Sequence, residues 1–221
     1  MPLFSGKNVA ELVNCVRRHG LVYHTCQLKD FRSYLKLGGI PSRALLKQSG
    51  LPFTAFDTDD VDQTNGVWDK VFFNFSDFGS GFANGGPGTP SPYGPINLVF
   101  NPSVLTTATD VAVTLRSAGA TGFDREKEGL SLAELPNIFV KYAFQKYNVK
   151  PKETLAAEFS NHEVGGNPEL NCSFPAQLAP LAAVRYLLVD PYPLNAPETL
   201  FTVVERLFKA ANLKQPVFER K

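Results

Sequence analysis

The chain has 221 residues, of which 43% are hydrophobic and 19% are charged, and its 22 basic side chains nearly balance 21 acidic ones. This composition is too apolar for intrinsic disorder, and the length allows a substantial buried core. The net charge of +1 gives no overall attraction to nucleic acid or a membrane surface, so such binding would have to depend on local clusters. No stretch approaches the roughly 18 apolar residues of a membrane span, and the N-terminus lacks the apolar core of a signal peptide. We therefore expect a folded, cytoplasmic protein without a membrane segment.

The first half of the chain predicts alternating helices and strands. Apolar residues at three-four spacing indicate amphipathic helices, and clusters of aromatic and β-branched residues indicate strands. In chain order we expect a helix at 7–18, a strand at 21–25, a helix at 27–37, an extended piece at 40–43, a short helix at 44–48, an acidic surface loop at 50–70 and a buried strand at 71–75.

The second half begins with residues 79–95, which are rich in Gly and Pro and predict a loop inserted into the domain. Beyond this insertion we expect strands at 96–100, 111–116, 169–174 and 184–190, with the strand at 111–116 half-buried, and helices at 133–147 and 197–214. Four to six strands with helices clustered early and late predict an α+β fold in a single domain spanning residues 1–221.

Several common kinds of active site are excluded by their missing motifs. The three histidines show no HExxH or HxH spacing, and Cys15, Cys26 and Cys172 form no CxxC pair, so we expect no metal and no disulfide framework. GxGxxG after a strand, GxxxxGK[ST] and GxSxG are all absent, which excludes the nucleotide-binding and hydrolase motifs that depend on them. The remaining candidates are an early Tyr-His-Thr strand, Arg43, the aromatic strand and a late strand led by a glutamate.

The order of these motifs resembles that of the ADP-ribosyltransferases, most closely the DarT-like branch, whose toxins modify DNA bases. The resemblance covers roughly residues 20–80 and 155–190, and its motifs are LVYHT, LKLGGIPSRALL, the acidic DTDDVD, VFFNF, the glutamate-led strand and VRYLLVD. It implies a split β-sheet core with flanking helices and NAD⁺ as co-substrate. It also implies a nucleic-acid acceptor, with a base of single-stranded DNA favoured, and a role as a toxin or phage-defence effector with an antitoxin partner.

The resemblance also implies roles for particular residues. Breaking the bond between nicotinamide and ribose places positive charge on the ribose ring, which a carboxylate stabilises, and Glu169 would take this role. His24 would hold a ribose through an imidazole N–H, with Thr25 donating beside it and Tyr23 in the same binding segment.

Two further roles follow from the same resemblance. Phe73 or Phe75 would stack on the nicotinamide ring, because an aromatic face attracts a flat cation. Arg43 would pair with the diphosphate or organise the acceptor, since its planar fork matches phosphate oxygens.

The chain departs from the family pattern at one position and leaves several alternatives open. DarT-like proteins carry an arginine beside an aspartate before the aromatic strand, but this stretch reads Asp60-Val61-Asp62, so that role falls to Arg43 or is absent. Glu163 is the second candidate for the catalytic carboxylate. The acceptor could instead be protein, RNA or a small molecule, and the alternative to an enzyme is a non-enzymatic binding module on the same scaffold. Phosphate contacts would come from local basic clusters at 17–19, Lys29-Arg32-Lys36, or Arg116 with Arg125.

Overall fold

The computed structural model of the chain describes most of its residues. These are residues 2–16, 20–75, 77, 93–115, 117–120, 122–124, 126, 129–131, 133, 158–159, 162–163, 168–191, 194 and 197–220. Nearly all of the helix expected at 133–147 and of the Gly/Pro-rich stretch at 79–95 lies outside the described residues.

A seven-stranded sheet with strand order β11-β10-β4-β1-β3-β8-β5 forms the centre of the molecule. Its strands are β1 (Val22–Cys26), β3 (Val71–Asn74), β4 (Ile96–Phe100), β5 (Asp110–Thr114), β8 (Glu169–Ser173), β10 (Val184–Val189) and β11 (Val217–Glu219). Neighbouring strands run antiparallel except β10 and β11, which are parallel. Such mixed sheets require helices or loops to cover their apolar faces.

The pairing between β1 and β3 is much weaker than that between the other central strands. β1 and β4 pair at five positions along their length, whereas β1 and β3 pair only at Tyr23 and Asn74. The sheet therefore divides beyond this single pair, and the two strands separate toward the C-terminal end of β1. This division is the split expected from the sequence.

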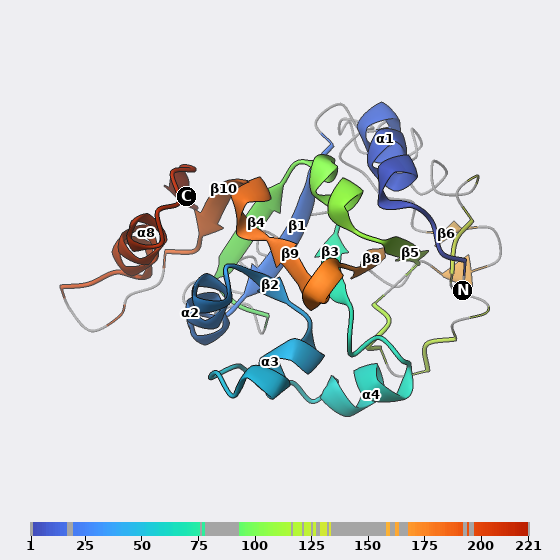
Figure 1. Ribbon diagram of the computed structural model, residues 1–221, viewed down its shortest axis with the longest axis horizontal. Coiled ribbons are helices and arrows are strands. Elements are labelled where there is room, and N and C mark those ends of the chain that lie inside the picture. Colours follow the sequence, from blue (N-terminus) through green and yellow to red (C-terminus); the bar gives the residue numbers. More distant parts are fainter. Residues whose placement is uncertain are drawn as a thin grey trace.

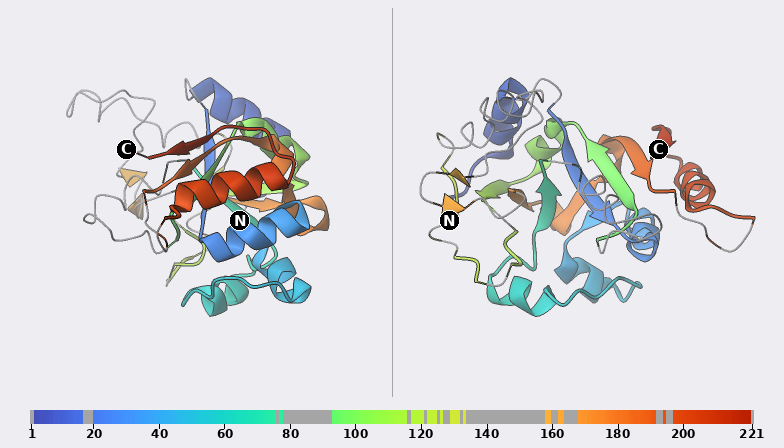
Figure 2. Two further views of the ribbon diagram at one scale, coloured as in Figure 1. Left: turned by 90° about the vertical axis from the view of Figure 1, so that its left-hand side faces the viewer. Right: turned by 180° about the vertical axis from the view of Figure 1, so that it is seen from behind.

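Helices flank the sheet at both ends. They are α1 (Gly6–Val16), α2 (Leu28–Leu37), α3 (Arg43–Ser49), α4 (Asp59–Thr64) and α8 (Leu200–Ala210), with 3₁₀ turns η1 (Pro102–Thr107), η4 (Pro175–Gln177) and η5 (Leu181–Ala183). The N-terminus and α1 lie near β5, whereas α8 and the C-terminus lie near β10 (Figure 1). Helices α2 and α8 lie side by side (Figure 2), and the rings of Phe31 and Phe208 stack between them with centroids 6.2 Å apart.

Two small sheets complete the described structure. β2 (Gly39–Pro41) pairs with β9 (Leu178–Pro180), and β6 (Glu158–Phe159) pairs with β7 (His162–Glu163). Between α2 and β2 the chain turns at Gly38, whose φ of 76° suits a residue without a side chain and whose N–H caps the helix at the Tyr34 carbonyl. No helix among the described residues combines the length and the apolar character that crossing a bilayer requires.

Most elements expected from the sequence are present, but four expectations were wrong. The stretch 50–70 is not only loop, because α4 forms within it with Asp59, Asp60 and Asp62 in its first turn, where negative charge stabilises a helix. The strand expected to be half-buried, β5, is buried along nearly all its length, whereas β3 alternates between buried and half-buried positions. The sheet has more strands than expected, since the short β11 carried no clear signal.

Candidate active site

The split between β1 and β3 opens into a pocket of about 150 Å³, close to the volume that holds a single six-membered ring. Its walls come from β1, α2, α3, α4, β3 and β8 and from the segments beside them. The lining residues are His24, Thr25, Cys26, Asp30, Tyr34, Arg43, Phe56, Thr58, Asp62, Phe72, Asn74, Tyr93, Ser117 and Glu169.

Glu169 is the buried carboxyl of this pocket. It is the first residue of β8, where it pairs with Asn74 of β3 on one side and Thr114 of β5 on the other, and it is only 7% exposed. The backbone N–H of Ala118 donates to its Oε1 at 3.1 Å. Burial raises the pKa of Glu169 to about 8, against the effect of that hydrogen bond. In the free pocket at neutral pH this carboxyl is therefore mostly protonated.

His24 bridges the split in the sheet. Its Nδ1 lies 2.8 Å from the carbonyl oxygen of Phe72, so Nδ1 carries the hydrogen and donates it to β3. Burial lowers the pKa of His24, which favours the neutral ring, and Nε2 then accepts from the hydroxyl of Tyr34 at 3.2 Å. An imidazole N–H free for a ribose, as expected from the sequence, does not fit this geometry. The Tyr34 hydroxyl oxygen is the group that this pair offers to a ligand.

Two polar atoms of the pocket wall have unsatisfied hydrogen-bonding capacity. The hydroxyl oxygen of Thr25 and the side-chain carbonyl oxygen of Asn74 are buried, and neither has a hydrogen-bond partner among the described residues. Leaving buried polar atoms unpaired costs roughly 1–3 kcal/mol each. A ligand that donates N–H or O–H groups would remove that cost, so the two atoms favour a polar ligand.

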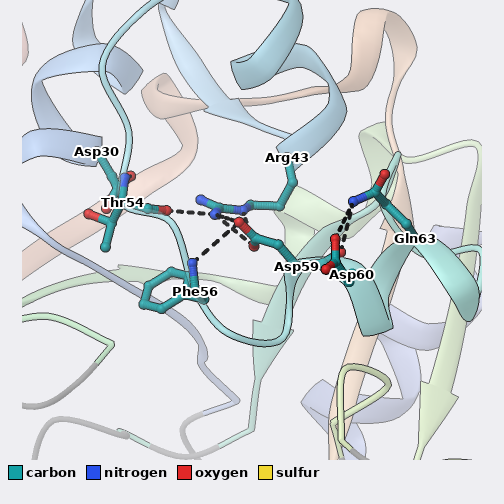
Figure 3. A network of polar contacts seen from close by, with 7 residues as sticks. All are labelled: Asp30, Arg43, Thr54, Phe56, Asp59, Asp60 and Gln63. Carbon is teal, nitrogen blue, oxygen red and sulfur yellow. Dashed lines mark hydrogen bonds and ion pairs between the residues drawn. The ribbon is translucent and has the colours of Figure 1, made fainter.

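Arg43 lies in the opposite wall, where an internal ion pair already engages it (Figure 3). Its guanidinium donates to both carboxylate oxygens of Asp59 at 2.8 Å and to the Thr54 carbonyl at 2.6 Å. The rings of Phe53 and Phe56 flank it, with centroids 4.8 and 5.1 Å from its central carbon. Arg43 therefore holds the segment before α4 against the pocket and is not a free cation awaiting a diphosphate.

The structure brings together four of the residues singled out from the sequence, namely His24, Thr25, Arg43 and Glu169. Tyr23 does not line the pocket. Phe73 and Phe75 are fully buried in the hydrophobic core, where Phe73 contacts Phe100 and Phe174, so neither is placed to stack on a ligand. The alternating direction of side chains along β3 presents Phe72 and Asn74 to the pocket instead.

The second candidate carboxylate, Glu163, lies on β7, whose backbone pairs with β6 in a separate two-stranded sheet. Several lining residues were missed from the sequence, chiefly Tyr34 and Asp30 on α2 and Asp62 on α4. Asp30 and Tyr34 stand four residues apart and are both buried, so a polar pair on the apolar face of a helix was the available signal. Of the Gly/Pro-rich stretch, Tyr93 reaches the pocket, and its ring lies 6.2 Å from that of Phe56.

No family model and no curated protein matches the chain. Solved structures of DarT from Thermus sp. 2.9 do match it across nearly all their length. The complex with ADP-ribosylated single-stranded DNA has a TM-score of 0.55 at 14% identity and covers 92% of this chain and 95% of that one. The complexes with carba-NAD⁺ and NAD⁺ have TM-scores of 0.51 and 0.50 at 13% and 15% identity, each covering 91% of this chain and 95% of the other. The chain thus has the fold of a DarT-like ADP-ribosyltransferase, and the fold expected from the sequence is confirmed.

Proposed function

We propose that this protein is an NAD⁺-dependent mono-ADP-ribosyltransferase whose acceptor is a nucleic acid, with a base of single-stranded DNA favoured. The observation that carries the proposal is Glu169, a buried carboxyl at the split of an ADP-ribosyltransferase fold, in a pocket whose volume matches that of a single ring. The structural neighbours from Thermus sp. 2.9 were solved with NAD⁺, with carba-NAD⁺ and with ADP-ribosylated single-stranded DNA. Those ligands support NAD⁺ as the co-substrate here.

The protonation of Glu169 fits this chemistry. A buried carboxyl that is mostly neutral when the pocket is empty becomes an anion more easily when a positive ring enters, and the nicotinamide of NAD⁺ is such a ring. As the bond to nicotinamide breaks, positive charge moves to the ribose, and a carboxylate within a pocket of low polarity stabilises it strongly. Burial of Glu169 therefore raises its pKa and also strengthens the interaction it makes in the transition state.

The unsatisfied atoms of the pocket wall support a ligand that donates hydrogen bonds. The Thr25 hydroxyl oxygen and the Asn74 side-chain carbonyl can accept from the carboxamide NH₂ of nicotinamide or from ribose hydroxyls. We assign these two residues, with the His24–Tyr34 pair, to binding NAD⁺.

A basic face on α2 supports a nucleic-acid acceptor. Lys29, Arg32 and Lys36 are exposed at three- and four-residue spacing on this helix and line a hollow between α2 and α8. The hollow contains no carboxylate among its lining residues. Three cations in a row match the repeating phosphates of a single strand, which are a main source of affinity for nucleic acid.

One observation favours a second candidate, a non-enzymatic binding module. Because Asp59 neutralises Arg43, the pocket offers no unpaired arginine to the diphosphate among its lining residues. A module that binds a ligand without cleaving it would bind NAD⁺ or its fragments but would release no nicotinamide.

The deciding experiment incubates the purified protein with NAD⁺ labelled in its adenosine part, together with single-stranded DNA, RNA or a cell lysate. The label should transfer to DNA with release of nicotinamide, and the Glu169→Gln variant should do neither. Label on RNA or protein instead would mean that the acceptor is that molecule and not DNA. Binding of NAD⁺ without nicotinamide release under any condition would favour the binding module.

A cellular role as a toxin or phage-defence effector belongs to the same proposal. Expression of the wild-type protein should then arrest growth, while Glu169→Gln should be tolerated at the same protein level. Equal growth of both strains would argue against the toxin role but would leave the transferase activity to the labelling experiment.

A further inference from the structure

A second buried carboxyl, that of Asp62, shares the pocket with Glu169. Asp62 lies one turn beyond Asp59 on α4, is only 8% exposed and lines the pocket. Unlike Asp59, its carboxyl accepts no hydrogen bond and forms no ion pair within the described part of the chain. Buried carboxyls normally have such partners, so a solitary one in a pocket indicates a role toward a ligand.

One loop, residues 117–119, lies between the two carboxyls and fixes their relation. The N–H of Ala118 donates to Glu169, and the carbonyl of Ala118 accepts from the side chain of Asn65 on α4's C-terminal side at 2.6 Å. Gly119 packs so closely on Asp62 that a Cβ at this position would lie 2.3 Å from the Asp62 Oδ1. The backbone N–H of Ala118 therefore fixes Glu169, and the absence of a side chain at Gly119 leaves room for the carboxyl of Asp62.

The transfer reaction requires two catalytic roles that a single carboxyl cannot easily combine. One group must stay ionised beside the positive ribose, because its negative charge stabilises the transition state. Another must take the proton that an N–H or O–H acceptor loses as it attacks. If Glu169 took that proton early, its charge would vanish when the ribose needs it most.

We propose that Asp62 is a second catalytic carboxyl of this pocket and acts as the general base toward the acceptor, while Glu169 stabilises the ribose cation; this inference rests on the proposed function. In the step, the bond from the ribose C1′ to nicotinamide breaks and its electron pair stays on the nicotinamide nitrogen. The lone pair of the acceptor nitrogen forms the new bond to C1′. The proton of that nitrogen passes to the Asp62 carboxylate, so that charge and atoms balance.

The ionisation of Asp62 in the free pocket agrees with the role of a base. Burial, followed by the charge of Asp59, raises the pKa of Asp62 to about 6, whereas the pKa of Glu169 is about 8. Arg43 opposes the shift of Asp62, and Asp62 in turn adds to the shift of Glu169. At neutral pH Asp62 is therefore mostly ionised in the free pocket and is available as a base.

The test measures two reactions of the same protein, which are label transfer to the acceptor and release of nicotinamide to water in its absence. Asp62→Asn should lower transfer by about 100-fold or more, the usual effect of losing a general base. It should lower nicotinamide release much less, because water needs little help to capture a ribose cation. Asp62→Glu, which keeps a carboxyl, should restore part of the transfer.

The matched control is Asp60→Asn, the same change on an exposed residue of α4, which should leave both reactions unchanged. The pH dependence of label transfer is a further measurement, which a purely structural role of Asp62 would not change. Without the like charge of Asp62, the limb of the profile that reports Glu169 should shift to lower pH.

Equal loss of both reactions in Asp62→Asn, without rescue by Asp62→Glu, would overturn the base role and indicate a structural one. Transfer at the wild-type rate in Asp62→Asn would overturn it as well. In either case the proposed transferase would stand. If the wild-type protein neither transferred label nor released nicotinamide, both proposals would fall together.

Discussion

The acidic residues at the pocket form two groups with opposite surroundings. Asp59 on α4 is fully paired, since both its oxygens accept from Arg43, whose guanidinium is flanked by aromatic rings. Glu169 on β8 and Asp62, one turn beyond Asp59 on the same helix, are buried without an ion pair in the described part of the chain, and both have raised pKa values. The first arrangement stabilises the fold, and the second makes the empty protein less stable while preparing the pocket for a positive ligand. The difference separates the residues that build the site from those that we expect to act in it.

The largest effect should come from replacing the carboxyl of Glu169 with an uncharged amide. We expect Glu169→Gln to lower nicotinamide release by at least about 100-fold, the effect of losing a charge that stabilises a transition state. Glu163→Gln, the alternative that the sequence leaves open, is the control and should retain activity. Inactive Glu163→Gln with active Glu169→Gln would reverse the assignment.

The same Glu169→Gln variant should be more stable than the wild type at alkaline pH. The pKa of Glu169 rises on folding from 4.5 to about 8, so the unfolded chain ionises first and the folded state loses stability as pH rises through this window. Glutamine removes that loss, which would amount to at most about 5 kcal/mol. Urea unfolding at about pH 4 and about pH 8.5 should show no difference between the two proteins at the lower pH and a more stable variant at the higher one. A variant that is less stable at both would mean that the carboxyl supports the fold.

The Arg43–Asp59 ion pair should respond in the opposite way, because removing its cation should destabilise the fold. Arg43→Ala leaves Asp59 without its cation, and we expect a loss of up to about 3 kcal/mol in the free energy of unfolding at neutral pH. The control is Arg206→Ala, which breaks an exposed pair with Glu198 and should cost less than about 1 kcal/mol. Chemical denaturation measures both. An Arg43 variant with wild-type stability but no NAD⁺ binding would instead assign Arg43 directly to the ligand.

A smaller effect should come from moving Asp62 without changing its charge. The added Cβ of Gly119→Ala would push the Asp62 carboxyl away, and we expect label transfer to fall by roughly ten- to a hundredfold, as for other small displacements of catalytic groups. In an Asp62→Ala background the same substitution should have little further effect, because the obstacle is gone. Additive losses in the double variant would mean that Gly119 acts through the loop and not through Asp62.

The smallest expected effect concerns the acceptor. Replacing Lys29, Arg32 and Lys36 together by glutamine should reduce the slope of log affinity against log salt for single-stranded DNA by about 2, the value for three lost phosphate contacts. Nicotinamide release without DNA should stay unchanged. Lys7→Gln, on α1 and strongly exposed, is the control for a general loss of positive charge. An unaltered salt dependence would place the DNA on another face.

The sequence predicted the scaffold better than the pocket. Strands such as β4 and helices such as α2 follow from their apolar patterns, and the position of Glu169 at the start of a strand follows from the turn before it. The pocket depends on finer geometry. In VFFNF both faces carry apolar side chains, so the pattern could not say whether Phe72 or Phe73 faces the split.

Helix α4 is the second feature that the sequence could not predict. Its sequence, DDVDQT, has no apolar periodicity and was interpreted as loop, yet the helix places Asp59 toward Arg43 and Asp62 toward the pocket. The spacing of three residues between those acids puts them near one another on a helix, but only the fold reveals that one is paired and the other is not.

The most direct test of the catalytic role of Glu169 is the pH dependence of kcat/KM for NAD⁺ in the wild-type protein. This dependence reports ionisations of the free enzyme. If the buried carboxyl of Glu169 must be ionised to act, kcat/KM rises with pH to a plateau, with a midpoint near the pKa of about 8, and Glu169→Gln shows no such rise. A flat profile, or a Glu169→Gln variant that follows the wild-type curve, would contradict this role of Glu169.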